Sequence, residues 1–513
     1  MSARVQSLID VGLSGIIIDI ECHLSNGLPA VVIIGFANKA VDEAKERLRS
    51  AFATSNIQLP KKRITLNLAP ADLPKDSTGF DLPMAVAIMQ ASQQVKEKPD
   101  DKTIIIGELG LDGSVRAVRG IIGKLLAGRE QGCTTFYIPA ANLKQALLVP
   151  NITIIPVQNV RDLYLHLNNT VKLKAIDTKD GRNLETVDEA EPTLSLADII
   201  GQSQAKRALE IAAAGGHNLL LNGPPGTGKS MLAKTLPAIL PPLSHEEMLE
   251  VTHLHSLAGK QYDQIVTTRP FRSPHHSASD IAIIGGGQNP RPGEISLAHR
   301  GVLFFDELPE FSRPSIEALR QPLEDHAITV ARAKDSITYP ANFILIATSN
   351  PCPCGFYGTA KACHCLPHQI VRYQRKVSGP ILDRIDMYVS VENITHDKLL
   401  TPTKKADDPT KDVSKRVRRV RDIQAKRFGT SQKLNADMTN HDIKTLGKVS
   451  PEAKAFLDRA AASLDISARS YMRAVKVART IADLDGTDGI TLPHISEALQ
   501  YRNHTMQAET QLV

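Results

Sequence analysis

The feature that most constrains this 513-residue chain is a glycine-rich segment that follows an apolar run and opens a helical pattern. The segment consists of Gly223, Pro224, Pro225, Gly226, Thr227, Gly228, Lys229 and Ser230. It has the spacing of a phosphate-binding loop, in which small residues let backbone N–H groups converge on phosphate oxygens. In such a loop Lys229 reaches the β- and γ-phosphate oxygens, and the Ser230 hydroxyl coordinates Mg²⁺. A chance glycine-rich turn is disfavoured, because eight positions and both flanking elements agree.

Two further strand patterns end in polar residues. Val302–Phe305 runs into Asp306 and Glu307, where a Mg²⁺ ligand and a base that polarises attacking water are expected. Phe343–Ala347 leads to Asn350, whose amide can orient the water or the γ-phosphate. An ordinary strand end is the alternative for both patterns, and the phosphate-binding loop upstream disfavours it.

An arginine, Arg384, follows a helical pattern at the far end of this region. It can reach the γ-phosphate of a neighbouring subunit and neutralise charge in the transition state. A surface salt bridge with Asp383 or Asp386 is the alternative.

The chain length predicts two to four domains. Residues 1–171 mix β-rich runs with helical patterns, residues 172–194 read as a polar linker, and residues 195–390 alternate helices with buried strands. Residues 391–513 show helical patterns only. The alternation in the third part predicts an α/β fold built on a parallel sheet.

Composition excludes some classes of protein. Aromatic residues make up 4% of the chain and Trp is absent, which disfavours a nucleic-acid reader that stacks bases. The net charge of +6 is compatible with binding of a polyanion but does not require it. We find neither an apolar run long enough to span a membrane nor a secretory signal, so a cytoplasmic location is expected.

Four of the six cysteines cluster within a short segment: Cys352, Cys354, Cys363 and Cys365. Clustered thiols in a reducing compartment indicate a metal or redox site, and four thiolates suit tetrahedral Zn²⁺. His364 and His368 are spare ligands. The Cys-x-Cys spacing is tighter than the usual Cys-x-x-Cys, so free or redox-active thiols and an iron–sulfur cluster remain alternatives.

These segments together resemble the ComM/YifB group of magnesium-chelatase-like AAA+ ATPases. The resemblance covers nearly the whole chain and rests on GQSQAKRALEIAAAGGHNLLLNGPPGTGKS, FRSPHHS, PRPGEISLAHRGVLFFDELPEF, SNPCPCG, ILDRIDMYV and SARSYMRAVKVARTIADL. It implies an AAA+ P-loop core with a helical lid, and a homohexameric ring that binds ATP and Mg²⁺ between subunits. Asn350 is then the sensor, Arg384 the trans-acting finger and Arg469 the lid sensor, with Arg473 as a second candidate.

The resemblance also implies an activity. Members of this group are expected to move DNA branches in both directions, which extends heteroduplex when imported single-stranded DNA recombines with the chromosome during natural transformation. The ATPase chemistry follows from the residues, whereas the DNA role rests mainly on the resemblance.

The segment between Lys229 and Asp306 is longer than a minimal P-loop core needs. It resembles the helix-2 insertion of this branch, which lines the pore of the ring. His275 and His276 lie in it, and we interpret them as pore or structural residues because no partner has metal-ligand spacing.

Residues Ile328–Tyr339 predict a β-hairpin with Arg332 and Lys334 near its tip. At that position both cations can bind the phosphate backbone of DNA in the pore. An ordinary basic hairpin is the alternative.

Two N-terminal segments, Leu73–Pro83 and Ile106–Lys124, resemble the Lon-type protease fold. This fold is an α+β domain of the ribosomal S5 domain 2 type. Lon proteolysis uses a Ser–Lys dyad. Here Gly79 takes the nucleophile position and Ile122 the lysine position, while Ser77 and Lys124 are out of register. We therefore expect a non-proteolytic domain that serves DNA binding or ring assembly.

The helical pattern Lys411–Arg427 carries eight basic residues and two aspartates. A solvated helix face is the favoured interpretation, and nucleic-acid contact is the alternative.

Two rival functions are a magnesium-chelatase-type motor that drives metal insertion into a tetrapyrrole, and an ATP-dependent Lon-like protease. The N-terminal domain and the paired cysteines speak against the first, because the plain chelatase motor lacks both. Gly79 and Ile122 speak against the second.

Overall fold

The computed structural model describes residues 2–11, 14–35, 43–73, 75, 78–178, 194–258, 264–287, 290–331, 336–359, 361–392 and 408–502. The chain folds into two compact units, residues 1–189 with 244–267, and residues 190–243 with 268–513. Most of the predicted linker, residues 172–194, lies outside the described residues. Within the described part, none of the helices has the length and apolar character needed to span a membrane.

The first unit is built on an eight-stranded mixed sheet with the order β10-β9-β8-β5-β1-β2-β4-β3. Its strands are β1 (Ser2–Val11), β2 (Ser14–Ser25), β3 (Ala30–Ile34), β4 (Arg63–Ala69), β5 (Thr103–Ile105), β8 (Thr135–Pro139), β9 (Thr153–Val157) and β10 (Ile176–Asp177). A small ribbon is formed by β6 (Glu108–Leu109) and β7 (Val115–Arg116). The long β1–β2 pair is antiparallel, whereas β5, β8 and β9 run parallel.

The helices of this unit are α2 (Ala44–Thr54), α3 (Asp81–Ala91), α4 (Ile121–Glu130), α5 (Leu143–Ala146), α6 (Val160–Leu167) and α9 (His245–Ala258). Helix α3 is buried along its whole length, as expected for a helix without a polar face. Its first residue, Asp81, pairs with Arg47 of α2 at 2.6 Å and accepts a hydrogen bond from the Leu109 amide at 3.1 Å. The buried carboxylate therefore has the partners that its burial requires.

Helix α9 belongs to the first unit, although it lies within residues 195–390, which the sequence predicts as one domain. Val251 and Leu254 are buried, and Met248 and Leu249 pack against the apolar cluster that surrounds α4. The apolar side chains of α9 are thus covered by the first unit, although α9 follows α8 of the second unit in the chain.

The second unit contains a five-stranded sheet with the order β12-β15-β18-β11-β19, and every pair in it is parallel. The strands are β11 (Leu219–Asn222), β12 (Phe271–Arg272), β15 (Val302–Phe305), β18 (Ile344–Ser349) and β19 (Met387–Ser390). This confirms the predicted parallel sheet. Because all strands point the same way, their carboxyl ends meet at one edge, where ligands bind in open α/β sheets.

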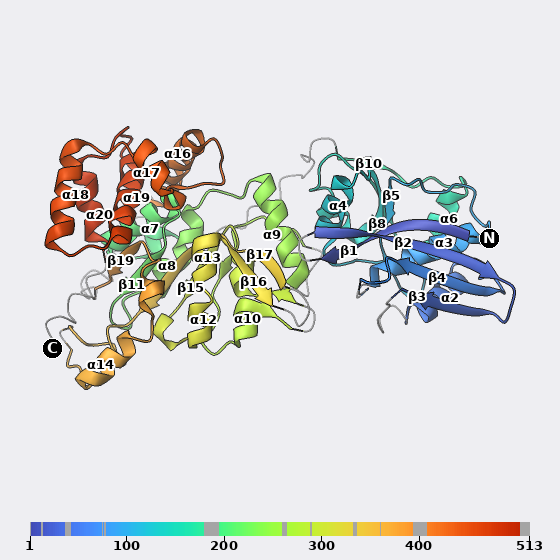
Figure 1. Ribbon diagram of the computed structural model, residues 1–513, viewed down its shortest axis with the longest axis horizontal. Coiled ribbons are helices and arrows are strands. Elements are labelled where there is room, and N and C mark those ends of the chain that lie inside the picture. The colour runs from blue at the N-terminus through green and yellow to red at the C-terminus, as the bar shows by residue number, and fades with distance from the viewer. Residues whose placement is uncertain are drawn as a thin grey trace. The chain divides into compact units, whose positions relative to one another are not determined.

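Helices and small hairpins complete this unit (Figure 1). They are α7 (Ser203–Gly215), α8 (Lys229–Ile239), α10 (Asp280–Ile284), α11 (Glu294–Leu297), α12 (Arg313–Glu317), α13 (Arg320–Asp325), α14 (Pro367–Gln374), α15 (Gly379–Leu382), and the hairpins β13 (Gly285–Gly286) with β14 (Arg291–Pro292), and β16 (Ala327–Ala331) with β17 (Ser336–Pro340).

The C-terminal helices are α16 (Thr410–Phe428), α17 (Asn440–Leu446), α18 (Pro451–Ser463), α19 (Ala468–Leu484) and α20 (Leu492–Gln500). Helices α17, α18 and α19 each begin after a Ser or Thr whose hydroxyl accepts a hydrogen bond from a backbone N–H of the first turn. Figure 1 shows these helices beside α7, which α16 and α19 contact. One apolar cluster includes residues of both the sheet and these helices, which belong to the same compact unit.

Candidate nucleotide site

Strand β11 leads directly into the glycine-rich loop. Leu219 and Leu221 are fully buried, and β11 lies between β18 and β19. The Gly223 amide donates a hydrogen bond to the Ser349 carbonyl at 3.2 Å. A Cβ on Gly223 would lie 2.2 Å from the Val391 carbonyl oxygen, so only glycine fits where the chain leaves the sheet.

The loop turns through two left-handed glycines. Gly226 has a φ of +82° and Gly228 a φ of +87°, a conformation that strongly favours glycine. The Thr227 hydroxyl donates to the Pro224 carbonyl at 3.0 Å, which closes the turn. Helix α8 begins at Lys229, so its free N–H groups and its positive dipole end face the loop. This backbone fits a bound polyphosphate.

The ammonium group of Lys229 is held by the loop itself. It donates to the carbonyls of Gly223 at 2.6 Å and Pro224 at 2.8 Å, and to the Asn350 side-chain oxygen at 3.1 Å. Burial lowers the pKa of Lys229, and the charges of Asp306 and Glu307 oppose this shift. The lysine is thus positioned at the loop by three acceptors that phosphate oxygens can replace.

Ser230 and Asp306 form the expected metal pair. The Ser230 hydroxyl donates to Asp306 at 2.9 Å, and the second Asp306 oxygen accepts a hydrogen bond from Thr348 at 2.7 Å. A hydroxyl and a carboxylate in contact beside a phosphate loop are oxygen donors of the kind that Mg²⁺ prefers. The donor set therefore fits Mg²⁺.

Glu307 and Asn350 lie next to this pair. Glu307 adopts a left-handed backbone, with φ 55° and ψ 56°, and its amide donates to the Thr348 hydroxyl at 2.7 Å. The Asn350 amide donates to the Glu307 carboxylate at 3.3 Å. Asn350 therefore contacts both Lys229 and Glu307, and the residues predicted from three separate strands lie together.

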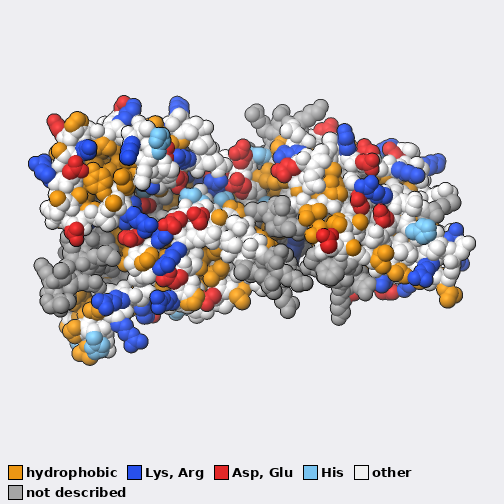
Figure 2. Space-filling view, viewed as in Figure 1, with side chains coloured by type: hydrophobic (Ala, Val, Ile, Leu, Met, Phe, Trp, Pro, Cys, Tyr) orange, Lys and Arg blue, Asp and Glu red, His pale blue; other side chains and the backbone are white. Residues whose placement is uncertain are grey.

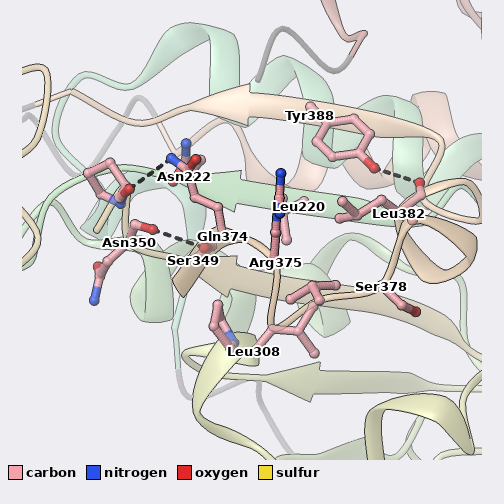
Figure 3. Close-up of a pocket in the computed structure, with 14 residues that line it drawn as sticks. Leu220, Asn222, Leu308, Ser349, Asn350, Gln374, Arg375, Ser378, Leu382 and Tyr388 are labelled. Carbon is pink, nitrogen blue, oxygen red and sulfur yellow. Dashed lines mark hydrogen bonds between the residues drawn. The ribbon is translucent and has the colours of Figure 1, made fainter. Parts of the chain in front are cut away.

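A cavity of about 270 Å³ adjoins Asn350 (Figure 3). The carboxyl ends of β11 and β18, the turn η4 (Leu308–Glu310), and α15 line it. Figure 3 shows Asn222 and Asn350 at one end and Ser378 and Leu382 at the other. The cavity thus separates the candidate sensor from the segment that precedes Arg384.

Arg384 forms an ion pair, but not with the aspartates that the sequence suggested. Its guanidinium pairs with Glu324 of α13 and donates to the Pro380 carbonyl at 2.5 Å. Asp383 lies 3.7 Å from Arg473, and Asp386 lies 3.6 Å from His217. Arg384 is 13% exposed, so its side chain is largely covered within this chain.

The two lid candidates differ. Arg469 is 62% exposed and lies 4.0 Å from Glu324, the residue that also holds Arg384. Arg473 is largely covered and donates to the Ile385 carbonyl at 2.5 Å. Hydrogen bonding to Arg384 lowers the pKa of Glu324, so this carboxylate stays ionised between the two arginines.

The four clustered cysteines converge. Their sulfur atoms all lie within 4.8 Å of one another, and those of Cys352, Cys354 and Cys363 are separated by 3.3, 3.5 and 3.7 Å. Thiolates bound to one tetrahedral Zn²⁺ at about 2.3 Å lie about 3.8 Å apart, so the cluster fits zinc. The backbone N–H of Phe356 lowers the pKa of Cys354 to about 6, whereas burial and the neighbouring thiols raise the pKa of Cys363 and of Cys365 in the absence of a metal. The spare residues His364 and His368 are exposed and outside this group.

The cysteine loop also contacts the phosphate loop. A Cβ on Gly355, whose φ is +83°, would lie 2.5 Å from the Pro225 ring. The backbone between Cys354 and Phe356 therefore packs closely on the candidate nucleotide site.

Comparison with known proteins decides the family. Residues 195–399 match the model of magnesium chelatase subunit ChlI, residues 20–142 a second ChlI model, and residues 407–502 that of the ChlI C-terminal region. The competence protein ComM of Haemophilus influenzae is 42% identical over 501 residues, which cover 98% of this chain and 97% of that protein. The chain belongs to the ComM/YifB family.

Other relatives support this assignment. The YifB protein of Escherichia coli is 41% identical over 497 residues, or 96% of this chain and 95% of that protein. The magnesium-chelatase 38 kDa subunit of Rhodobacter capsulatus is 28% identical over 178 residues, or 31% of this chain and 51% of that protein. Likeness to the YifB protein thus extends over far more of the chain than likeness to this chelatase subunit.

The hairpin predicted in this member of the ComM/YifB family is present. Strands β16 and β17 pair antiparallel from Ala327 with Pro340 to Ala331 with Ser336. Arg332 and Lys334 lie outside the described residues. His275 and His276 are exposed, with ring centroids 4.2 Å apart, and belong to no metal-ligand group among the described residues.

Several basic side chains of α16 serve the fold of this family member. Arg416 pairs with Glu210 of α7 at 2.6 Å, and Arg427 pairs with the buried Asp483 of α19. Arg421 donates to the Ala213 carbonyl at 2.8 Å. These contacts anchor α16 to its neighbours, so these three arginines pack on the fold instead of lying on the solvated face that the sequence predicted.

The positions aligned with the Lon dyad are buried. Gly79 lies in the turn η1 (Thr78–Phe80), and its carbonyl accepts the Gly107 amide at 2.9 Å. Ile122 is fully buried on α4, and Lys124 donates to the Arg119 carbonyl at 2.8 Å. Ser77 lies outside the described residues.

Sequence reasoning missed two residues that contact the candidate site residues: Thr348 and Glu324. Thr348 is fully buried and bonds to both Asp306 and Glu307. A usable signal was its position, because Thr348 directly follows the predicted strand Phe343–Ala347 and lies two residues before Asn350, on the same side under strand alternation. Glu324 carried no local signal, because its partners are 60 and 145 residues away in the sequence (384 − 324 and 469 − 324).

Proposed function

We propose that this protein is an ATPase that works as a ring-shaped DNA motor. In this proposal it is a homohexameric branch-migration helicase, which extends heteroduplex when imported DNA recombines during natural transformation. One observation carries the ATPase part: the contacts that join Lys229, Ser230, Asp306, Glu307 and Asn350 at the carboxyl edge of one parallel sheet.

Each side chain has a defined role in hydrolysis. The loop amides and the Lys229 ammonium bind the phosphate oxygens, and Ser230 and Asp306 hold Mg²⁺. When bound, Mg²⁺ neutralises charge that develops on the phosphate oxygens. The Glu307 carboxylate accepts the proton of the attacking water, and the Asn350 amide orients Glu307 and that water.

Arg384 completes the site of a neighbouring subunit in this proposal. A guanidinium supplied in trans stabilises negative charge in the transition state. Within one chain, the Arg384 guanidinium is paired with the Glu324 carboxylate. In the proposed ring, phosphate oxygens bound to the neighbouring subunit replace that carboxylate as the partner of Arg384. Arg469, which shares Glu324, is the proposed lid sensor.

The DNA part rests on the family. The relative that is 42% identical over 98% of this chain is named a competence protein. The proposed DNA contacts are Arg332 and Lys334, which lie between β16 and β17 in the sequence. The proposed resident ions are Mg²⁺ and one structural Zn²⁺ on the four cysteines.

The test measures ATP hydrolysis by the full chain, without DNA and with single-stranded or branched DNA, together with movement of a labelled junction. Single-stranded and branched DNA should stimulate hydrolysis, and ATP should drive junction movement. Lys229→Ala and Glu307→Gln should each lower turnover by at least about 100-fold, because they remove phosphate binding and the general base. Lys234→Ala is the matched control, since Lys234 is an exposed lysine on the same helix.

The outcomes separate this function from its rivals. Hydrolysis that DNA does not stimulate, with no junction movement, would contradict the motor and favour a chelatase-type role. Absence of hydrolysis in the wild-type protein would contradict all of these functions. ATP-dependent cleavage of an unfolded protein substrate would favour the protease.

A further inference from the structure

A second, larger cavity lies apart from the phosphate loop, between the segment Pro309–Arg313 and helix α14. Its volume is about 790 Å³, within the range of clefts that hold ligands. Its lining is mainly basic and includes Arg313, Arg372, Arg375 and Lys376, together with His368. We call it the basic cavity. Figure 2 shows Lys and Arg side chains gathered over the region of α14.

The positive charge of the basic cavity is only partly compensated. Lys376 pairs with Glu310 at 3.2 Å. Arg313 and Arg372 are exposed, and neither forms an ion pair with any residue that the structure describes. Among the described residues that line the cavity none is acidic, so this lining presents an excess of guanidinium groups.

The shape and chemistry of this surface suit phosphate. Guanidinium groups bind phosphate oxygens through paired N–H donors. A surface rich in carboxylates would instead repel phosphate. Between these groups lie apolar side chains, among them Phe311, whose ring centroid is 4.3 Å from that of Phe305. Phe311 is buried and its ring packs inward, so the cavity offers cations rather than exposed rings for base stacking.

The basic cavity adjoins the machinery of the candidate nucleotide site. Arg375 and Ser378 line both this cavity and the smaller cavity beside Asn350. Along the chain, Asn350, the cysteine loop, α14, α15 and Arg384 follow one another without another domain between them. Occupancy of the basic cavity would therefore act on residues next to both the sensor and the finger.

We propose that the basic cavity binds the phosphate backbone of single-stranded DNA, as a contact surface additional to the β16–β17 hairpin. This inference rests on the proposed function. Exposed cations such as Arg313 and Arg372 around an open cavity can hold a polyanion without reading its sequence, which suits a motor that moves along any sequence.

The test uses the double variant Arg313→Gln with Arg372→Gln in the full chain. Its binding to a labelled, mixed-sequence single-stranded oligonucleotide is measured by fluorescence anisotropy over a range of KCl concentrations. The affinity at low salt should fall about tenfold, and the slope of log affinity against log salt should become shallower by about 1.4, since two phosphate contacts are lost. ATP hydrolysis without DNA should stay at the wild-type rate.

The matched control removes two cations elsewhere. Lys454 and Arg459 of α18 are exposed, so Lys454→Gln with Arg459→Gln changes the net charge equally and should leave affinity and slope unchanged. If both double variants lost DNA affinity equally, the loss would be explained by the change in net charge, and the proposal would be overturned.

Three other outcomes are decisive. If the wild type binds DNA and the Arg313 and Arg372 variant binds it equally well, this inference fails and the proposed motor stands. If the variant keeps DNA binding but raises the KM for ATP, the cavity serves the nucleotide instead, and the inference fails. If the wild type binds no DNA, the proposed motor and this inference fail together.

Discussion

Thr348 joins the two acidic residues of the candidate nucleotide site. Its hydroxyl donates to Asp306 and accepts from the Glu307 amide, both at 2.7 Å, and its side chain is fully buried. Because Glu307 adopts a strained left-handed backbone, this contact helps to hold the carboxylate where the strand ends. Thr348 is therefore a positioning residue for the proposed ATPase.

Replacing Thr348 tests that role. Thr348→Val keeps the shape but removes the acceptor of the Glu307 amide and one of the two hydrogen-bond donors to Asp306, which should lower kcat about 10- to 100-fold. The KM for ATP should change little, and more Mg²⁺ should be needed for half-maximal rate. Thr348→Ser restores the hydroxyl and should recover most of the rate in the same assay. A Val variant with wild-type kcat and Mg²⁺ dependence would show that the hydroxyl has no positioning role.

At the scale of elements, the cysteine loop connects β18 to α14. It follows Asn350 directly, and Gly355 packs against Pro225 of the phosphate loop. A metal at Cys352, Cys354, Cys363 and Cys365 would cross-link this loop, because the loop has no helix or strand of its own among its described residues. Zinc would then stabilise the local structure on which Asn350 depends.

Metal analysis of the purified protein should find one zinc per chain. Cys354→Ser should lose the zinc, lower the melting temperature and slow ATP hydrolysis, because the loop is then no longer cross-linked. The control is Cys133→Ser, which changes a buried cysteine outside the cluster and should retain the metal. Well under one zinc per wild-type chain would exclude the zinc site.

Helix α9 packs on α4 through a buried histidine. A Cβ on Gly123 of α4 would lie 2.3 Å from the His253 ring, so the two helices approach closely at this glycine. Neither ring nitrogen of His253 has a hydrogen-bond partner among the described residues. Burial, with a smaller effect of the Lys124 charge, lowers the pKa of His253 from 6.5 to about 4.

This shift predicts acid sensitivity. Between pH 6.5 and about pH 4 the unfolded chain binds a proton that the folded chain does not, so the free energy of unfolding falls as the pH falls. The loss should reach about 2 kcal/mol near pH 5. Denaturant unfolding at pH 7 and pH 5 should show a smaller pH effect in His253→Leu than in the wild type. The variant of an exposed histidine, His441→Leu, should keep the full effect, and an unchanged pH effect in His253→Leu would contradict the assignment.

At the scale of the whole molecule, the proposed ring requires residues from two chains at each site. Lys229 and Glu307 belong to the sheet edge of one chain, whereas Arg384 is held by Glu324 and contacts none of them directly. Each chain thus carries the nucleotide-binding residues and the proposed finger, Arg384, at two different places.

Mixing variants tests the division. Lys229→Ala and Arg384→Ala should each be nearly inactive alone, but a one-to-one mixture should recover about a quarter of the wild-type ATPase rate, because random pairing leaves that share of sites with both intact groups. A mixture of Lys229→Ala with Glu307→Gln is the control, since both residues act at the same chain's site and nothing should be recovered. No recovery in the first mixture would exclude a trans-acting Arg384.

The sequence by itself determined the features that depend on short spacing. The phosphate loop, the strand Val302–Phe305 with its following acids, and the cysteine spacing could be predicted because neighbouring residues carry the whole signal. The approach of Lys229, Asp306 and Asn350 also followed, since parallel strands bring their carboxyl ends to one edge.

Only the tertiary structure decided the contacts between distant segments. It paired Arg384 with Glu324 rather than with the neighbouring aspartates, and it turned several arginines of α16 inward to bind α7 and α19. It also grouped α9 with the N-terminal unit and the C-terminal helices with the sheet. The physical reason is that a local pattern records which face of a helix is apolar or charged, whereas burial depends on which distant surface covers that face.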